Sequence, residues 1–183
     1  MEIIELPLAG AKLIRPRVFR DPRGFFFESY SQERYRQGGI PEVWVQDNHS
    51  QSCQGTLRGL HYQSTPGQAK LVRVSRGRIF DAIVDIRLGS PTFGKWYGLE
   101  VDAEEHSQVY IPVGFAHGFC VLSETAEVQY KGSAPYDGAT ECAIRWNDPD
   151  IGVAWPLQSP VLSARDQASE SFADFKARLG QAR

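Results

Sequence analysis

Residues 55–63 place two reactive side chains in one short apolar segment. The segment reads Gly-Thr-Leu-Arg-Gly-Leu-His-Tyr-Gln, and its leucines and tyrosine are typical of a buried strand. His61 can exchange a proton near neutral pH, and Arg58 can bind an anion. Strand alternation sends these two side chains to opposite faces, so a shared pocket requires a β-bulge at Gly59. The alternative is a core strand with one hydrogen-bonded histidine and one arginine at its edge.

Two neighbouring strand-like runs, residues 70–75 and 78–88, place Lys70 and Asp81 among apolar side chains. Residues 76–77 have the composition of a two-residue hairpin loop, and this pairing puts Lys70 and Asp81 on one largely apolar face. Charged groups on such a face are costly unless they are paired or used, so the face is a candidate site. The alternative is a solvated lysine on the other face, with the aspartate at its rim.

Alternation also groups other polar side chains. In the extended segment 43–49 it places Gln46 and Asn48 on one face. Residues 112–114 read as a turn that leads into a strand, and this strand presents His117 and Phe119 on one face.

The composition indicates a globular protein with a small-molecule ligand. The chain has 183 residues, of which 42% are hydrophobic and 23% charged, and its net charge is -2. These values argue against disorder and against a general nucleic-acid surface. The start has no signal-like segment, no apolar run approaches membrane-spanning length, and the three cysteines lack paired or metal-type spacing. We therefore expect a cytoplasmic protein that has free thiols and no membrane segment.

Short extended segments separated by turns make up most of the chain, which predicts an all-β sandwich or barrel. Helices are expected only near the ends. One is predicted at 31–37 with Ser31 as its cap, and another where Phe172, Phe175 and Leu179 recur at helical spacing. We expect a single domain over 1–183, with a core at about 43–147, an N-terminal arm at 1–42 and a helical tail at 160–183.

A series of ordered motifs resembles one enzyme family. The motifs are Asp-Pro-Arg23-Gly-Phe-Phe26, Gln46-Asp-Asn48, Leu-Arg58-Gly-Leu-His61-Tyr-Gln, Lys70-Leu-Val-Arg, Phe-Asp81, Pro-x-Gly-Phe-Ala-His117-Gly-Phe, Tyr130-Lys, Trp-Asn-Asp and Leu-Ser-x-x-Asp166. Together they resemble the dTDP-4-dehydrorhamnose 3,5-epimerases. The resemblance implies a cupin-like jelly-roll fold. It also implies epimerisation of dTDP-4-keto-6-deoxy-D-glucose at C3 and C5 to dTDP-4-keto-L-rhamnose, in deoxysugar biosynthesis.

The resemblance assigns catalytic roles that suit the chemistry. Epimerisation beside a ketone requires removal of an α-proton, stabilisation of the enolate oxygen and protonation from the opposite face. The resemblance implies that His61 is the base and that Asp166 orients it. Lys70 would stabilise the enolate, and Tyr130 would return the proton. No cofactor is needed.

The resemblance also implies a site for the nucleotide half of the substrate. Arginines are expected beside the phosphates and aromatic side chains beside the base. The matching residues are Arg23 and Arg58 for the phosphates, Phe26 and Tyr136 for the base, Glu28, Gln46, Asn48 and Glu141 as polar contacts, and His117 with Asp81 as a second pair in the pocket. Family members are dimers, so a homodimer in which the Arg23 segment reaches the neighbouring site is expected. Without the resemblance, the simpler interpretation is a solvated turn for Arg23, core for Phe26 and surface for Glu141.

Two departures from the family pattern affect the prediction. The His-x-His ligand pair of metal-binding cupins is replaced by His61-Tyr62-Gln63, which argues against a metal. The loop 132–138 has an unusual placement of proline and glycine. Relatives of the family include enzymes that act at only one carbon or isomerise the keto group, so a single-site epimerase or ketoisomerase is the main alternative. A metal-dependent cupin oxygenase and a non-catalytic sugar-nucleotide-binding module are the others.

Overall fold

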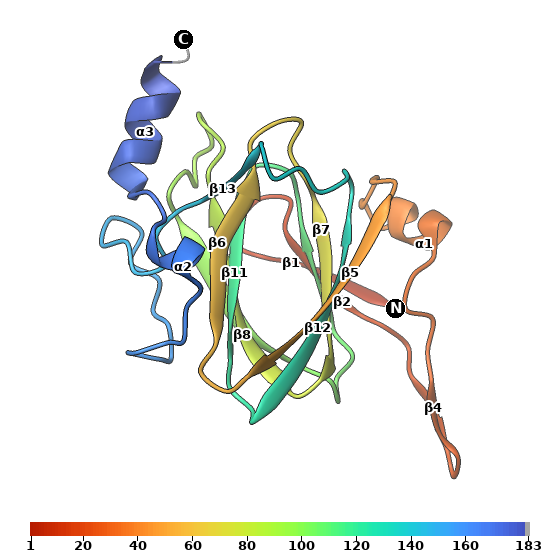
Figure 1. Cartoon of the computed structure of the whole chain (residues 1–183). Coiled ribbons are helices and arrows are strands. Elements are labelled where there is room, and N and C mark those ends of the chain that lie inside the picture. The colour runs from red at the N-terminus through yellow and green to blue at the C-terminus, as the bar shows by residue number, and fades with distance from the viewer. Residues whose placement is uncertain (182–183) are drawn as a thin grey trace.

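Two antiparallel β-sheets face each other and hold the core between them (Figure 1). The structure is a computed structural model and describes residues 1–181. One sheet has six strands, the other has five, and a two-stranded hairpin lies outside both. This arrangement confirms the predicted all-β jelly-roll fold with short helices near the ends.

The first sheet has the strand order β1, β2, β10, β7, β12, β5, which span Glu2–Glu5, Lys12–Arg15, Gln108–Ile111, Lys70–Arg76, Thr125–Gly132 and Gln46–Cys53. The second sheet has the order β13, β6, β11, β8, β9, which span Glu141–Ala143, Leu57–Gln63, Phe115–Val121, Arg78–Asp85 and Trp96–Asp102. Every neighbouring pair of strands is antiparallel.

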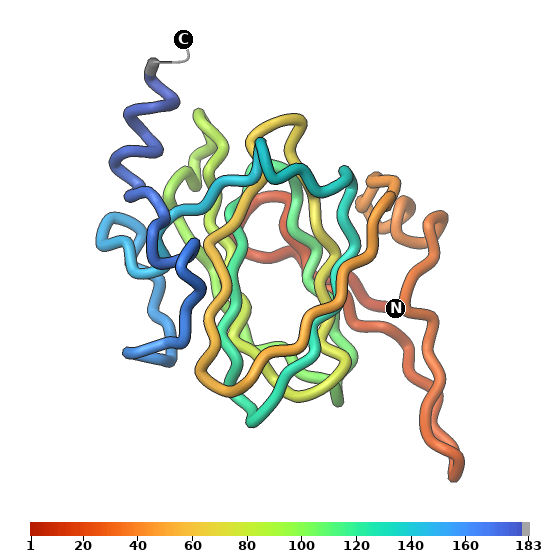
Figure 2. The backbone as a smooth tube through the Cα atoms, in the orientation of Figure 1, coloured from red at the N-terminus to blue at the C-terminus, as the bar shows by residue number. Residues whose placement is uncertain are grey.

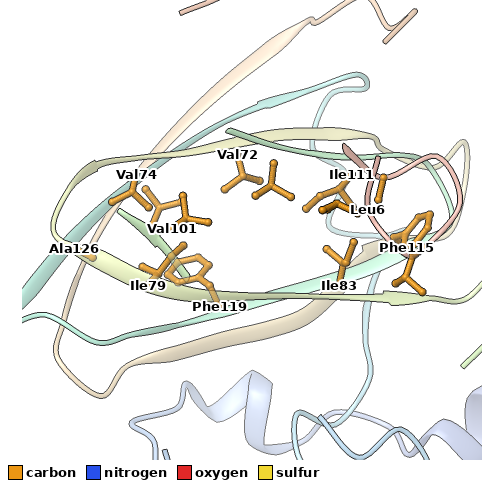
Figure 3. Close-up of a cluster of buried hydrophobic side chains, with 14 of the residues drawn as sticks. Leu6, Val72, Val74, Ile79, Ile83, Val101, Ile111, Phe115, Phe119 and Ala126 are labelled. Carbon is orange, nitrogen blue, oxygen red and sulfur yellow. The ribbon is translucent and has the colours of Figure 1, made fainter. Parts of the chain in front are cut away.

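Strand alternation explains the core. Val72 and Val74 of β7 point inward from the first sheet, and Ile79 and Ile83 of β8 meet them from the second (Figure 3). Residues two apart on a strand share a face, so each strand presents one apolar row to the interior. Burial of each such side chain contributes about 1.5–3 kcal/mol to folding, which holds the two sheets together around the site.

The predicted hairpin between residues 70–75 and 78–88 is wrong. Strand β7 pairs with β10 and β12, whereas β8 pairs with β9 and β11 in the other sheet. The chain crosses between the sheets at Gly77, whose φ of 75° favours glycine. Lys70 and Asp81 therefore belong to facing sheets and not to one wall. They still share the interior, because Lys70 is in phase with Val72 on β7 and Asp81 with Ile79 on β8. The charge of Asp81 therefore acts on the pKa of Lys70.

The predicted N-terminal arm contributes two strands to the first sheet. Strands β1 and β2 extend this sheet from β10, so it begins before the predicted core boundary at residue 43. The hairpin of β3 (Phe19–Asp21) and β4 (Gly24–Phe26) then projects away from the barrel (Figures 1 and 2). Helix α1 (Gln32–Gln37) follows Ser31 as predicted, but the serine side chain makes no capping hydrogen bond.

The C-terminal segment covers the second sheet on the side away from the barrel interior (Figure 1). Helix α3 (Phe172–Gln181) buries Phe172 against a cluster that includes Leu60 and Tyr62 of β6. These two side chains point outward, so His61 between them points into the barrel. The shorter helix α2 (Ala164–Gln167) also contacts β6. No helix within residues 1–181 is long and apolar enough to cross a membrane.

Candidate active site

A histidine and an aspartate from distant parts of the chain form a close pair. His61 Nε2 on β6 lies 2.5 Å from Oδ1 of Asp166 on α2. Burial raises the pKa of Asp166, but hydrogen bonds from His61 and Ser163 outweigh it, so the net shift is downward. An ionised carboxylate only accepts hydrogen bonds, so Nε2 carries the proton. Nδ1 is then the ring nitrogen that can accept a proton from a substrate.

A β-bulge at Gly59 directs Arg58 toward the same interior as His61. His61 pairs with His117, and Arg58 pairs with Phe119. The two pairs are three residues apart on β6 but only two residues apart on β11, so β6 contains one extra residue. The sequence required a β-bulge at Gly59 if Arg58 and His61 were to share a pocket, and the bulge is present. Gly59 has a φ of 125°, and a Cβ there would lie 2.5 Å from the backbone of strand β11. The positive charge of Arg58 accordingly acts on Tyr130.

The first sheet places a lysine and a tyrosine opposite the histidine. Lys70 on β7 and Tyr130 on the neighbouring strand β12 are partly buried, and Nζ lies 5.8 Å from the centroid of the tyrosine ring. Burial lowers the pKa of Lys70 to about 8, against the opposing effect of Glu141 and Asp81. Burial also raises the pKa of Tyr130, so its phenol stays protonated at neutral pH.

A second histidine–aspartate pair lies deeper between the sheets. His117 Nε2 on β11 lies 2.7 Å from Oδ2 of Asp81 on β8, and the aspartate is fully buried. Asp81 Oδ1 has no hydrogen-bond partner within residues 1–181. An unsatisfied carboxylate oxygen in the interior is costly, and Asp81 lies close enough to act on the pKa of Lys70.

Polar side chains surround the mouth of the cavity. Gln46 donates to Asn48 Oδ1 at 2.9 Å and accepts from the backbone N–H of Tyr136 at 2.7 Å, so it fixes the loop that carries this tyrosine. Tyr136 is 56% exposed, which leaves its ring free to contact a ligand. The cavity is lined by Asn48, His61, Tyr62, Gln63, Gln68, Lys70, Tyr130, Tyr136 and Glu141.

Two residues near the pair were absent from the sequence prediction. Arg165 forms an ion pair with Glu141 at the mouth of the cavity. Ser163 donates to Asp166 Oδ2 at 2.7 Å. The Ser-x-x-Asp spacing is a helix-capping pattern and signals the serine. No spacing rule signals the arginine, because its partner lies 24 residues away on another element.

Three predicted binding residues lie away from this cavity. The Arg23 side chain is 91% exposed and pairs with Asp21 at the tip of the β3–β4 hairpin. Phe26 is 71% exposed on the same hairpin, and Glu28 pairs with Arg34 at 3.3 Å. The interpretation of Phe26 as a core residue is therefore wrong. Within one chain these residues do not complete the site (Figure 1).

Both histidines of the barrel interior are paired with carboxylates. His61 and His117 each direct Nε2 to an aspartate. Within residues 1–181, no group of three or more histidine, cysteine, aspartate or glutamate side chains is arranged to hold a metal ion. The metal-free site stays a prediction from the replaced His-x-His pair.

Comparison with known proteins decides the family. A family model described as dTDP-4-dehydrorhamnose 3,5-epimerase matches residues 5–174. The chain belongs to this family. A dTDP-4-dehydrorhamnose 3,5-epimerase from Pseudomonas aeruginosa is 51% identical over 176 residues, which cover 95% of this chain and 97% of that protein. One from Neisseria gonorrhoeae is 50% identical over 174 residues, or 94% of this chain, but the match spans 53% of its length.

A solved structure of the family shows the same fold. The dTDP-6-deoxy-D-glucose-3,5-epimerase of Legionella pneumophila Philadelphia 1, in complex with dTDP-4-keto-L-rhamnose, superposes with a TM-score of 0.93. It is 46% identical, and the match covers 97% of this chain and 96% of that one. The predicted resemblance to the dTDP-4-dehydrorhamnose 3,5-epimerase family is thus confirmed, and the chain is an isomerase.

Proposed function

We propose that this chain epimerises dTDP-4-keto-6-deoxy-D-glucose at C3 and C5 to dTDP-4-keto-L-rhamnose, without a cofactor. The observation that carries the proposal is the placement of acid and base on facing sheets. His61 lies on β6 of one sheet, and Tyr130 lies on β12 of the other, around one cavity. Inversion of a carbon requires that one group removes a proton from one face and another returns a proton to the opposite face.

Each step assigns a proton to a named atom. His61 Nδ1 takes the α-proton from C3 or C5, and the electron pair moves to the C4 carbonyl oxygen as an enolate. The ammonium of Lys70 stabilises this oxygen in a site of low dielectric. The Tyr130 hydroxyl then donates its proton to the opposite face of the same carbon, and the C4 ketone forms again. Tyr130 then takes up a proton from solvent, and His61 releases the α-proton to solvent.

The nucleotide half of the substrate is assigned to the mouth of the cavity and to a second subunit. The exposed ring of Tyr136 lies at the mouth, where a base can bind, and Arg58 on β6 supplies a guanidinium for a diphosphate. Arg23 and Phe26 project from the barrel on a hairpin with three exposed phenylalanines, Phe19, Phe25 and Phe26. Such a hairpin is suited to cover the site of a partner chain, which supports a homodimer with shared sites. The cytoplasmic location stays a prediction from the sequence.

Deuterium exchange into the substrate tests the function. The ketosugar nucleotide is incubated with the protein in heavy water, and proton NMR follows the signals at C3 and C5. We expect both signals to disappear while the rhamno-configured product forms. His61→Asn keeps the size of the side chain but lacks a base, and it serves as the control without exchange. Exchange at one carbon would support a single-site epimerase, and no exchange in the wild type would leave a binding module.

A further inference from the structure

Two Ser-x-x-Asp segments near the C-terminus share one geometry, but only the first contacts the candidate base. Ser163 Oγ accepts from the N–H of Asp166 at 3.1 Å and donates to its Oδ2 at 2.7 Å. Ser171 Oγ accepts from the N–H of Asp174 at 3.1 Å and donates to its Oδ2 at 2.6 Å. Both serines therefore cap a helix in the same way.

The two aspartates differ in their surroundings. Asp174 is exposed, so water can replace the serine hydroxyl at its carboxylate. Asp166 is 3% exposed, and its hydrogen bonds come from His61 on Oδ1, Ser163 on Oδ2 and the backbone N–H of Gly59. A buried carboxylate that loses a donor retains its charge without compensation. The hydroxyl of Ser163 thus does more for Asp166 than a helix cap requires.

We propose that Ser163 is a positioning residue for the catalytic base. Its hydroxyl fixes one oxygen of Asp166, so that the other oxygen holds Nε2 of His61 and leaves Nδ1 toward the substrate. The inference rests on the proposed function, because it assigns the role of base to His61. The sequence Ser163-x-x-Asp166 then has two functions, since the serine oxygen caps α2 and the serine proton orients the carboxylate.

Lys70 faces the His61–Asp166 pair from the other sheet, and two further charge pairs lie nearby. His117, which pairs with His61 across the ladder, is bound to Asp81. Glu141 on β13 is paired with Arg165. Without Ser163, the charge of Asp166 acts more fully on His61. The pair then binds its proton more tightly, and the base is blocked at higher pH.

Matched serine variants test the inference. We expect Ser163→Ala to lower kcat about tenfold with little change in KM, the effect of one lost hydrogen bond to a buried charge. The acid limb of its kcat/KM profile should move to higher pH. Ser171→Ala loses the equivalent cap and should keep the wild-type profile. Loss of the cap should lower the melting temperature of both variants by about 2–4 °C, and Ser163→Ala should lose more, because it also removes a donor from a buried carboxylate. Ser163→Thr keeps the hydroxyl and should restore the profile.

The outcomes separate this inference from the proposed function. Equal kcat and pH profiles for Ser163→Ala and Ser171→Ala would overturn the positioning role, because water would then replace the hydroxyl. If Ser163→Ala does not fold, Ser163→Gly gives the same test, since glycine caps nearly as well and has no hydroxyl. The imidazole proton shared by His61 and Asp166 provides a readout without substrate. A shift of its NMR signal in Ser163→Ala alone supports the inference even if the wild type does not epimerise, whereas an unchanged signal contradicts it.

Discussion

The alkaline limb of activity is expected to report Lys70. Enolate stabilisation requires the charged ammonium, and burial lowers the pKa of this group to about 8. Because the charged form is the active one, activity is retained below this pKa and lost as the pH rises through it. The ratio of charged to neutral lysine falls tenfold per pH unit, so kcat/KM should be about half its maximum at pH 8 and about a tenth at pH 9.

Substitution by arginine identifies the group. A guanidinium stays protonated throughout this range, so Lys70→Arg should lack the alkaline limb. The maximal activity of Lys70→Arg should be lower, because a planar guanidinium replaces the compact ammonium beside the enolate oxygen. The assay follows the reaction by NMR from pH 6 to 10. The pH dependence of kcat/KM reports ionisations of the free enzyme. Burial raises the pKa of Cys120 to about 11 and also raises that of Tyr130, so neither group accounts for a limb near pH 8.

Two results would refute this reasoning. A wild-type profile that stays flat to pH 10 would show that no charged lysine is needed. A limb near pH 8 that persists in Lys70→Arg would assign it to another group. Circular dichroism at pH 10 serves as the control, because loss of fold would also remove activity.

Three further changes have distinct expected outcomes. Tyr130→Phe should slow inversion about 10²-fold while deuterium exchange continues, and normal inversion by NMR would remove Tyr130 from the mechanism. Arg23→Ala should raise KM with kcat little changed, and mixing it with His61→Ala should restore one site per heterodimer. No recovery on mixing would place each site within one chain. Exhaustive chelation should leave activity unchanged, because His61 and His117 direct Nε2 to carboxylates, and rescue by added metal would contradict this.

Local sequence rules could predict the chemistry of strand β6. Alternation between Leu60 and Tyr62 sends His61 to the opposite face from both, and the glycine next to Arg58 marks a place where the register can shift. The partner of the histidine could not be predicted from spacing, because Asp166 lies 105 residues away on a helix. Only the resemblance to a known family supplied that contact, and the structure supports it with a distance.

The strand pairing of β7 and β8 shows where local rules fail. Two apolar runs around a tight turn favour a hairpin, but the same pattern serves a chain that crosses between two facing sheets. Both arrangements present alternate residues to one core, so the pattern of apolar residues does not distinguish them. The sequence alone could not predict that the β3–β4 hairpin projects from the barrel either. Its exposed phenylalanines look like core residues in a single sequence.

Two charged groups that oppose stability in the barrel, Lys70 and Asp81, belong to the candidate site. Lowering the pKa of Lys70 from 10.5 to about 8 corresponds to roughly 3 kcal/mol lost from folding while the lysine is charged, a cost present below pH 8 and removed as the pH approaches 10.5. Asp81 adds a buried oxygen without a partner among residues 1–181. Apolar residues at both positions would pack between the sheets at lower cost. The apolar strand around Lys70 therefore marks it as a candidate functional residue before any fold is known, because packing alone gives no reason for a charge there.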